Sequence, residues 1–171
     1  NSNSYYYASA HLYGSDTPYG QDTGAIESVF GKSDTWVAMV PKDDIARQSE
    51  LSAALHEIPE VTSILSYVDT VGPEIPMEYL DENTLNLLVG ENYSRFVITV
   101  DSDAEGGAAF AIVERVRGVL ENIYPGEYYL AGDGVSTYDL MDTITADTVK
   151  VNLIAIGAVF VVLLFSFKSL S

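Results

Sequence analysis

The hydrophobic positions in the middle of the chain fall into short runs separated by longer amphipathic stretches. TWVAMV at 35–40 and VTSILSYV at 61–68 are rich in β-branched and aromatic residues and are bounded by Gly, Pro and acidic residues, which is typical of buried strands. Between them, residues 43–58 are predicted to form a helix, because apolar residues recur at intervals of four and three. Its apolar stripe consists of Leu51, Leu55 and Ile58.

The same order of elements returns in the second half of the chain. RFVITV at 95–100 is predicted to be a strand, residues 104–123 a helix, and EYYLAG at 127–132 a fourth strand. Pro125 marks the end of this second helix. Its apolar stripe consists of Phe110, Val113, Val116, Leu120 and Ile123.

Two consecutive β-α-β units predict an α+β fold, namely a ferredoxin-like β-α-β-β-α-β sandwich with one four-stranded sheet and two helices on one face. We expect this domain to occupy residues 31–134, after a lead-in segment at 1–30 in which residues 22–30 form a short helix. An insertion at 71–94 separates the two halves. Its apolar residues predict a short amphipathic helix.

The C-terminal segment is predicted to contain a membrane span. Residues 151–167 carry no charge, and the run is too long and too evenly apolar for an amphipathic helix of a small soluble domain. At 1.5 Å per residue, this length is about the minimum for crossing ~30 Å of hydrocarbon. We therefore expect residues 135–171 to form a helix that runs into a transmembrane span at about 149–170. The alternative, a buried core helix of a larger soluble protein, fits this length less well.

The residues beside the span predict its orientation. Lys168 follows the apolar run and the acidic domain precedes it, so the positive-inside tendency places residues 1–148 on the extracytoplasmic side of the cell membrane. Lys150 on the outer side weakens this prediction. No Gly or Pro occurs between Ser136 and Ala155, so we expect one continuous helix to join domain and span. Such a helix would act either as a stiff lever or as a simple anchor.

Composition narrows the classes of function. All 25 acidic residues and six of the eight basic ones precede residue 149, so this part carries a formal charge of −19. Binding to nucleic acid or to anionic lipid needs a Lys and Arg patch, and none is visible. Cysteine is absent, which excludes disulfides, thiolate metal sites and a Cys nucleophile. An exported domain of this size without cysteine is commonest among bacterial surface proteins.

Short motifs in the chain are incomplete. DTG at 22–24 matches the aspartic protease triplet, but the mechanism needs two copies and one is present. GKS at 31–33 resembles the end of a P-loop, yet Ile26 stands where that loop needs glycine. Three alternating acids resemble part of a calcium loop without its remaining ligands, and we interpret them as helix-capping residues. They are Asp101, Asp103 and Glu105.

Other polar residues do not form a site either. His11 and His56 are far apart in the sequence and lack a third partner at metal-ligand spacing. NYS at 92–94 is a glycosylation sequon that has meaning only in a eukaryote. No arrangement of Ser, His and Asp stands out. We therefore expect no catalytic, cofactor-binding or metal-binding residues, no cofactor and no enzyme activity.

Several stretches occur in an order that is typical of one transporter family. They are FGKSDTWVAMVP at 30–41, EVTSILSYVDTVGPEIP at 60–76, NYSRFVITV at 92–100, YPGEYYLAGDGVSTYDL at 124–140 and FSFKSLS at 165–171. On these stretches the chain, over about residues 25–171, resembles the porter domains of the resistance-nodulation-division (RND) superfamily. It is most similar to the MMPL branch, which exports lipids and hydrophobic compounds, and more similar to the second of that branch's two porter loops than to the first.

The resemblance implies the extracytoplasmic domain of a proton-driven exporter, forming part of the path of a lipid or hydrophobic substrate. Its partners would be the remaining transmembrane helices and the other porter loop of the same transporter, and a homo-oligomer stays open. The family's proton-relay acids lie in other membrane helices, so no residue here is assigned that role. The alternative is a membrane-anchored extracellular sensor or adhesion domain, whose gene would encode one or two spans instead of many.

The insertion supplies the candidates for contact with substrate or with a partner domain, because it is more apolar than an exposed loop requires. The alternative is that its apolar residues close the open end of the domain's own core. The candidates are Met77, Leu80, Leu87 and Leu88.

Overall fold

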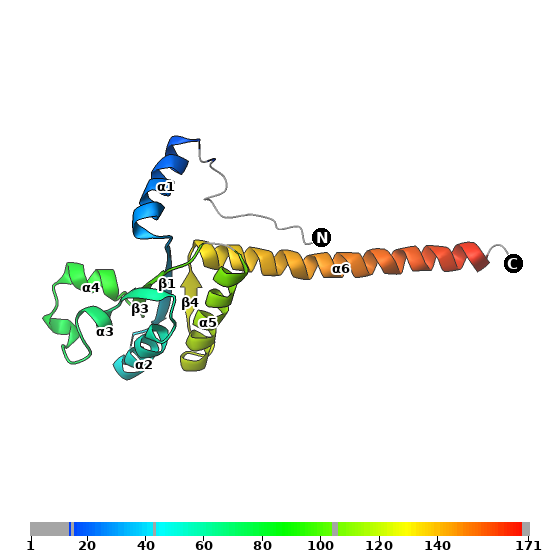
Figure 1. The fold of residues 1–171 in the computed structure, drawn as a ribbon. Helices are drawn as coiled ribbons and strands as arrows, with labels where there is room; N and C mark the ends of the chain where they lie inside the picture. Colours follow the sequence, from blue (N-terminus) through cyan, green and yellow to red (C-terminus); the bar gives the residue numbers. More distant parts are fainter. Residues whose placement is uncertain (1–13, 15, 43, 104–105, 169–171) are drawn as a thin grey trace. The chain divides into compact units, whose positions relative to one another are not determined.

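The computed structural model describes residues 14, 16–42, 44–103 and 106–168 and shows a mixed α+β fold (Figure 1). By their internal contacts, residues 1–137 and 138–171 form two separate units. The first contains a four-stranded antiparallel sheet. The second consists of most of the long C-terminal helix.

The sheet has the strand order β2-β3-β1-β4, and every neighbouring pair is antiparallel. The two central strands, β1 (Asp34–Pro41) and β3 (Tyr93–Val100), pair along their whole length. The edge strands are shorter: β2 (Val61–Leu65) pairs with β3, and β4 (Tyr129–Ala131) pairs with β1. The strands predicted at 35–40, 95–100 and 127–132 are confirmed, with boundaries that differ by one to two residues.

The core lies on one face of this sheet. Alternate residues of β1 and β3 are buried, as expected when one face is covered. The helices α2 (Ile45–His56) and α5 (Gly107–Ile123) contact each other and supply the opposing apolar stripes (Figure 1). The largest fully buried side chains include Trp36, Phe96, Ile98, Leu51, Leu55, Leu120 and Tyr124.

The two helices begin differently. Asp44 caps α2 by accepting a 3.0 Å hydrogen bond from the backbone N–H of Arg47. The prediction that acids cap the second helix is wrong for Asp101 and Asp103, because α5 begins after Gly106 without a side-chain cap. A capping side chain must stand directly before the first turn, and both acids lie too far upstream. Glu105 lies outside the described residues.

The strand predicted over 61–68 ends early. It stops at Leu65, and residues Tyr67–Thr70 form the short helix α3. The cause is an N-cap: the Ser66 hydroxyl accepts a hydrogen bond from the backbone N–H of Asp69 at 3.2 Å and donates one to the Asp69 carboxylate at 2.5 Å. This reciprocal pair turns the chain out of the sheet.

The insertion after α3 contains two short helical elements. A 3₁₀ turn, η2, spans Met77–Tyr79, and α4 spans Glu82–Leu88, so the predicted short helix is present. A bridge between Val89 and Ser94 returns the chain to the sheet, and β3 begins at Tyr93, inside the predicted insertion.

Helices also flank the domain. The N-terminal helix α1 spans Pro18–Phe30 and begins four residues earlier than the predicted helix, because Thr17 caps it and proline is favoured in the first turn. The C-terminal helix α6 spans Asp133–Lys168 without interruption, as predicted from the lack of Gly and Pro between Ser136 and Ala155. Positions 169–171 of the expected C-terminal helix lie outside the described residues.

Candidate functional site

The first turn of α6 is fixed to β1 by one carboxylate. Asp34 begins β1 and is 9% exposed. Its Oδ2 accepts hydrogen bonds from the Trp36 indole N–H at 2.6 Å and from the backbone N–H of Gly134 at 2.8 Å. Its Oδ1 accepts a 2.8 Å bond from the backbone N–H of Thr35. A helix N-terminus leaves backbone N–H groups without helical partners, and this carboxylate satisfies one of them in α6.

Close packing surrounds this hydrogen-bond cluster. Gly132 precedes α6, and a Cβ there would stand 2.5 Å from Cδ1 of Trp36 and 3.1 Å from the carbonyl oxygen of Thr35. Glycine is therefore the residue that fits. Val135 and Thr137 are buried, at 1% and 7% exposure. The first turn of α6 thus belongs to the core of the domain.

The remainder of α6 has the properties of a membrane span. Among the described residues, it is the one helix that is long and apolar enough to cross a membrane, with a mean hydropathy of 2.3 in its most apolar stretch. This conclusion rests on length and composition. Its large apolar side chains are exposed, which water would disfavour and lipid would not. They include Leu153, Ile154, Ile156, Val159, Phe160, Leu163, Leu164 and Phe165.

The structure places the four insertion candidates in different environments. Leu88 is 4% exposed and belongs to the core, whereas its neighbour Leu87 is 65% exposed. Met77 and Leu80 are half-buried. Tyr79 is 77% exposed, and sequence reasoning missed it because it emphasised the leucines. The insertion therefore both closes part of the core and exposes apolar side chains.

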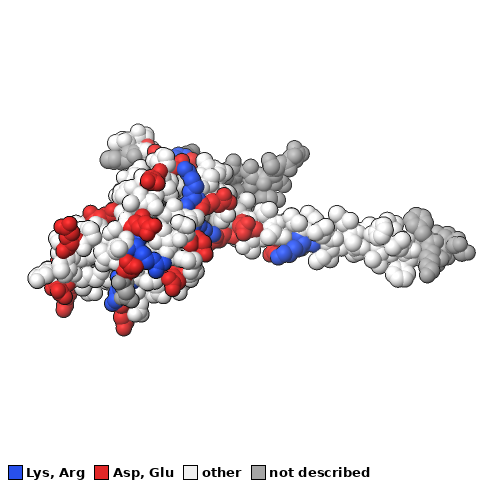
Figure 2. Space-filling model, turned by 90° about the horizontal axis from the view of Figure 1, so that it is seen from below, with Lys and Arg blue, Asp and Glu red and all other residues white. Residues whose placement is uncertain are grey.

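The surface around the insertion is acidic. No Lys or Arg occurs between Arg47 and Arg95, a stretch that contains nine acidic residues. Figure 2 shows Asp and Glu spread over the face of the domain that is in view. The sequence of α6 has no charged residue between Lys150 and Lys168. Because like charges repel, this surface disfavours anionic partners.

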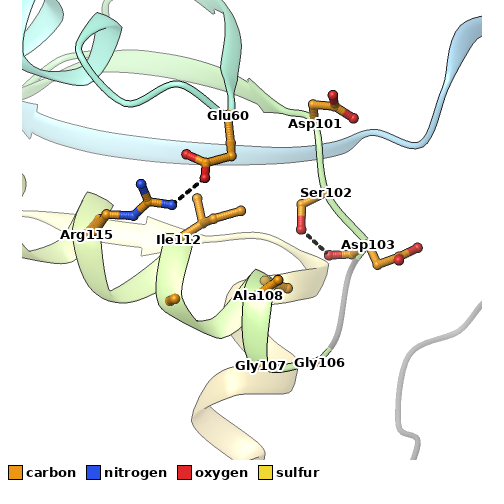
Figure 3. A pocket seen from close by; sticks show the side chains of 11 residues that line it. Glu60, Asp101, Ser102, Asp103, Gly106, Gly107, Ala108, Ile112 and Arg115 are labelled. Carbon is orange, nitrogen blue, oxygen red and sulfur yellow. Dashed lines mark hydrogen bonds and ion pairs between the residues drawn. The ribbon is translucent and has the colours of Figure 1, made fainter.

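A surface cavity of about 530 Å³ lies at the start of α5 (Figure 3). Arg115 reaches across it and pairs with Glu60 at 2.7 Å, and this hydrogen bond lowers the pKa of the Glu60 carboxyl. Asp101 and Asp103 stand at the opposite rim. Asp103 also pairs with Lys32, and that hydrogen bond raises the pKa of the lysine.

The chemistry of this cavity is mixed. The amides at the N-terminus of α5 favour an anion, but three carboxylates line the same space and the guanidinium is already paired. Among the described residues that line it, the Ser102 hydroxyl donates to the backbone carbonyl of Asp103 and to no side-chain base. The cavity therefore has no arrangement typical of a catalytic centre.

The remaining candidate residues stay apart. DTG at 22–24 lies on α1, and GKS at 31–33 links α1 to β1. His56 stands 3.3 Å from the Asp69 carboxylate that anchors α3, and His11 lies outside the described residues. Among the described positions, no group of three or more metal-ligating side chains is present.

The features so far are an acidic α+β domain and, after it, a helix that is long and apolar enough to span a bilayer, which is the organisation of a membrane-anchored domain. Residues 20–171 match the sequence model of the MMPL family, and the chain belongs to this family. It is thus part of a membrane transporter of the RND/MMPL type, which works together with its own transmembrane segments. No curated protein matches the chain.

Proposed function

We propose that this chain is the extracytoplasmic porter domain of a proton-driven exporter of lipids or hydrophobic compounds, and that the domain forms part of the substrate path. The observation that supports the proposal is membership of the MMPL family over residues 20–171, together with the apolar helix that follows the domain. The domain has no enzyme activity in this proposal. Proton relay belongs to membrane helices elsewhere in the transporter.

The proposed domain is ferredoxin-like. Its strand order, β2-β3-β1-β4, and its fully antiparallel pairing support this proposal, because a β-α-β-β-α-β sandwich has the same order and pairing. The two long helices, α2 and α5, contact each other, as they do when both cover one face. Additional short helices interrupt the link between β2 and β3.

The proposed orientation places residues 1–148 outside the cytoplasm. A charge of −19 precedes the apolar stretch and Lys168 follows it, which supports this direction. The chain has no cysteine, so a single cysteine can be introduced into it as a probe of topology, with any cysteine elsewhere in the transporter replaced by serine. We expect a membrane-impermeant maleimide, added to intact cells, to label Thr62→Cys and not Ser171→Cys. Labelling of Ser171→Cys alone would reverse the orientation.

Within the proposed path, the exposed part of the insertion contacts the hydrophobic substrate or the other porter domain. Leu87 and Tyr79 support this role because they are apolar or aromatic and largely exposed. Leu88 supports the core instead, since it is buried. A contact role and a packing role therefore fall on neighbouring residues of α4.

Substitution can separate these roles. Leu87→Asp in the full-length transporter should reduce export of N-phenyl-1-naphthylamine, a neutral hydrophobic dye, while leaving the amount of folded protein unchanged. Val29→Asp, at a similarly exposed position of α1 (72%), is the matched control and should export normally. Leu88→Asp should lower the amount of folded protein, because it buries a charge. Normal export by folded Leu87→Asp protein would remove the insertion from the substrate path.

A further inference from the structure

We infer that Asp34 is the residue through which the membrane helix acts on the centre of the sheet. This inference rests on the proposed transport function, because the motion to be transmitted is that of a transporter. Asp34 is a positioning residue in this role. It touches no substrate, and it holds the first turn of α6 against β1.

The hydrogen bonds of Asp34 join parts of the chain that are far apart in sequence. Gly134 lies one hundred residues after Asp34, and the bond between them connects the start of β1 to the start of α6. The Trp36 indole donates to the same oxygen, which fixes the direction of that oxygen. Hydrogen bonds from helix-terminal N–H groups to a carboxylate are among the stronger ones in proteins.

The other connection from α6 to the sheet runs through β4, the strand that precedes α6 in the chain. It makes fewer contacts with the core than β1, to which α6 is joined by the hydrogen bond between Gly134 and Asp34. The helix follows β4, which has three residues and pairs with β1 alone. Two of these residues, Tyr129 and Ala131, have exposed side chains. By contrast, β1 pairs with β3 along all eight residues and carries Trp36 in the core. A force that reaches the first turn of α6 is therefore delivered to β1 through Asp34.

The helix itself is suited to deliver such a force. Its backbone is helical from Asp133 to Lys168, and Gly157 is the one Gly or Pro after the first turn. Rigid elements with a defined contact at each end are the physical means by which coupling between distant parts travels. The buried turn around Val135 is one such contact.

Amide hydrogen exchange on the full-length transporter in lipid nanodiscs tests whether Asp34 holds the first turn of α6 against β1. Asp34→Ala should accelerate exchange in peptides covering residues 132–138 by about tenfold or more, because the bond that holds the Gly134 N–H is lost. Trp36→Phe is the matched control, since it removes a donor to the same carboxylate and leaves that bond. It should accelerate exchange there by less than about threefold. Protection of β3 reports whether each variant remains folded.

Unchanged exchange at 132–138 in folded Asp34→Ala protein would overturn the inference, because packing alone would then hold the first turn of α6. Should Asp34→Ala fail to fold, Asp34→Asn takes its place. The amide oxygen of asparagine is neutral and accepts hydrogen bonds more weakly than a carboxylate, so the bond to the Gly134 N–H weakens and exchange at 132–138 should again rise more than in Trp36→Phe.

Dye export separates the inference from the proposed function. Per folded molecule, Asp34→Ala should export N-phenyl-1-naphthylamine at least about tenfold more slowly than Trp36→Phe, because it removes the contact that transmits motion from α6 to β1. Equal export by the two variants, with the turn released in one of them, would disprove transmission through Asp34 and leave transport intact. Wild-type protein that exports no dye would contradict the proposed function and leave the exchange result standing.

Discussion

The central strand β1 and the insertion that follows α3 use apolar residues in opposite ways. In β1, Trp36, Ala38 and Val40 are fully buried, and the backbone is paired on both sides. In the insertion, Tyr79 and Leu87 are mostly exposed, and the secondary structure consists of short helical turns. Residue type alone therefore does not say where a side chain contributes to stability.

The difference assigns separate tasks to the two regions. The strand holds the domain together and receives the first turn of α6 through Asp34. The insertion leaves apolar surface available at the cost of few buried contacts, as is typical of segments that bind or move. Comparing the effect of the same type of substitution in the sheet and in the insertion tests whether the two regions have these separate roles.

The largest expected difference comes from removing apolar side chains. Phe96→Ala deletes a fully buried ring on β3, next to β1, and should lower the free energy of unfolding by about 3–5 kcal/mol. Leu87→Ala should change it by less than about 0.5 kcal/mol, because the side chain is already exposed. Urea unfolding of the 171-residue chain in detergent micelles, followed by far-ultraviolet circular dichroism, measures both. Similar losses in the two variants would show that the insertion is part of the core.

Two glycine-to-alanine substitutions should change the free energy of unfolding in opposite directions. Gly132→Ala places a methyl group 2.5 Å from Trp36 and should destabilise the domain by about 1–3 kcal/mol through overpacking. Gly118→Ala, in the interior of α5 with open space around it, should stabilise by about 0.5–1 kcal/mol. The same urea titration gives both values. A neutral Gly132→Ala would mean that the packing between β1 and the start of α6 is loose.

Added salt should stabilise the domain by screening the repulsion among acidic residues in and around the insertion. Nine acids and no Lys or Arg lie between Arg47 and Arg95, so raising KCl from about 0.05 to 1 M should stabilise the chain by about 1 kcal/mol through screening. Glu78→Gln in the insertion should reduce this gain. Asp103→Asn, which removes the partner of Lys32, should increase it, since salt no longer weakens a favourable pair. Equal salt responses in the two variants would contradict the role of the insertion.

The sequence predicted the central elements well because their signals are local and strong. Alternating or continuous apolar runs define β1 and β3, and spacings of three and four define α2 and α5. The end of β2 was missed, although Ser66 is a favourable N-cap residue, because the apolar run extends through it. Local hydrophobicity and local capping competed there, and capping prevailed.

The contact between β1 and α6 could not be predicted in the same way. Asp34 reads as a polar residue before a strand, and nothing near it indicates that its partner is Gly134. Only the antiparallel placement of β4 beside β1 brings the two together. The division between Leu87 and Leu88 is also a tertiary result, since adjacent residues on one short helix point to different surroundings. Contacts between residues that only the strand order brings together cannot be predicted from local sequence patterns.

The smallest expected effect concerns the hydroxyl of Tyr124, which follows α5. The residue is fully buried, its ring lies 4.2 Å from the Arg47 guanidinium, and its hydroxyl finds no hydrogen-bond partner among the described residues. Burial raises the pKa of this phenol from 10.0 to about 12. The unfolded chain therefore ionises first, and the contribution of the neutral phenol to stability, complete below pH 10, is lost as the pH rises through 12.

Tyr124→Phe should therefore raise the free energy of unfolding by up to about 1 kcal/mol at neutral pH, because an unsatisfied hydroxyl leaves the core. It should also flatten the loss of stability between pH 10 and 12. Tyr79→Phe in the insertion is the matched control, and it should change neither quantity because its ring is 77% exposed. Urea midpoints measured from pH 7 to pH 12 decide the matter. A Tyr124→Phe profile that still falls as steeply as the wild type would mean that this phenol is hydrated in solution, and the core beside α5 would then resemble the insertion in its access to water.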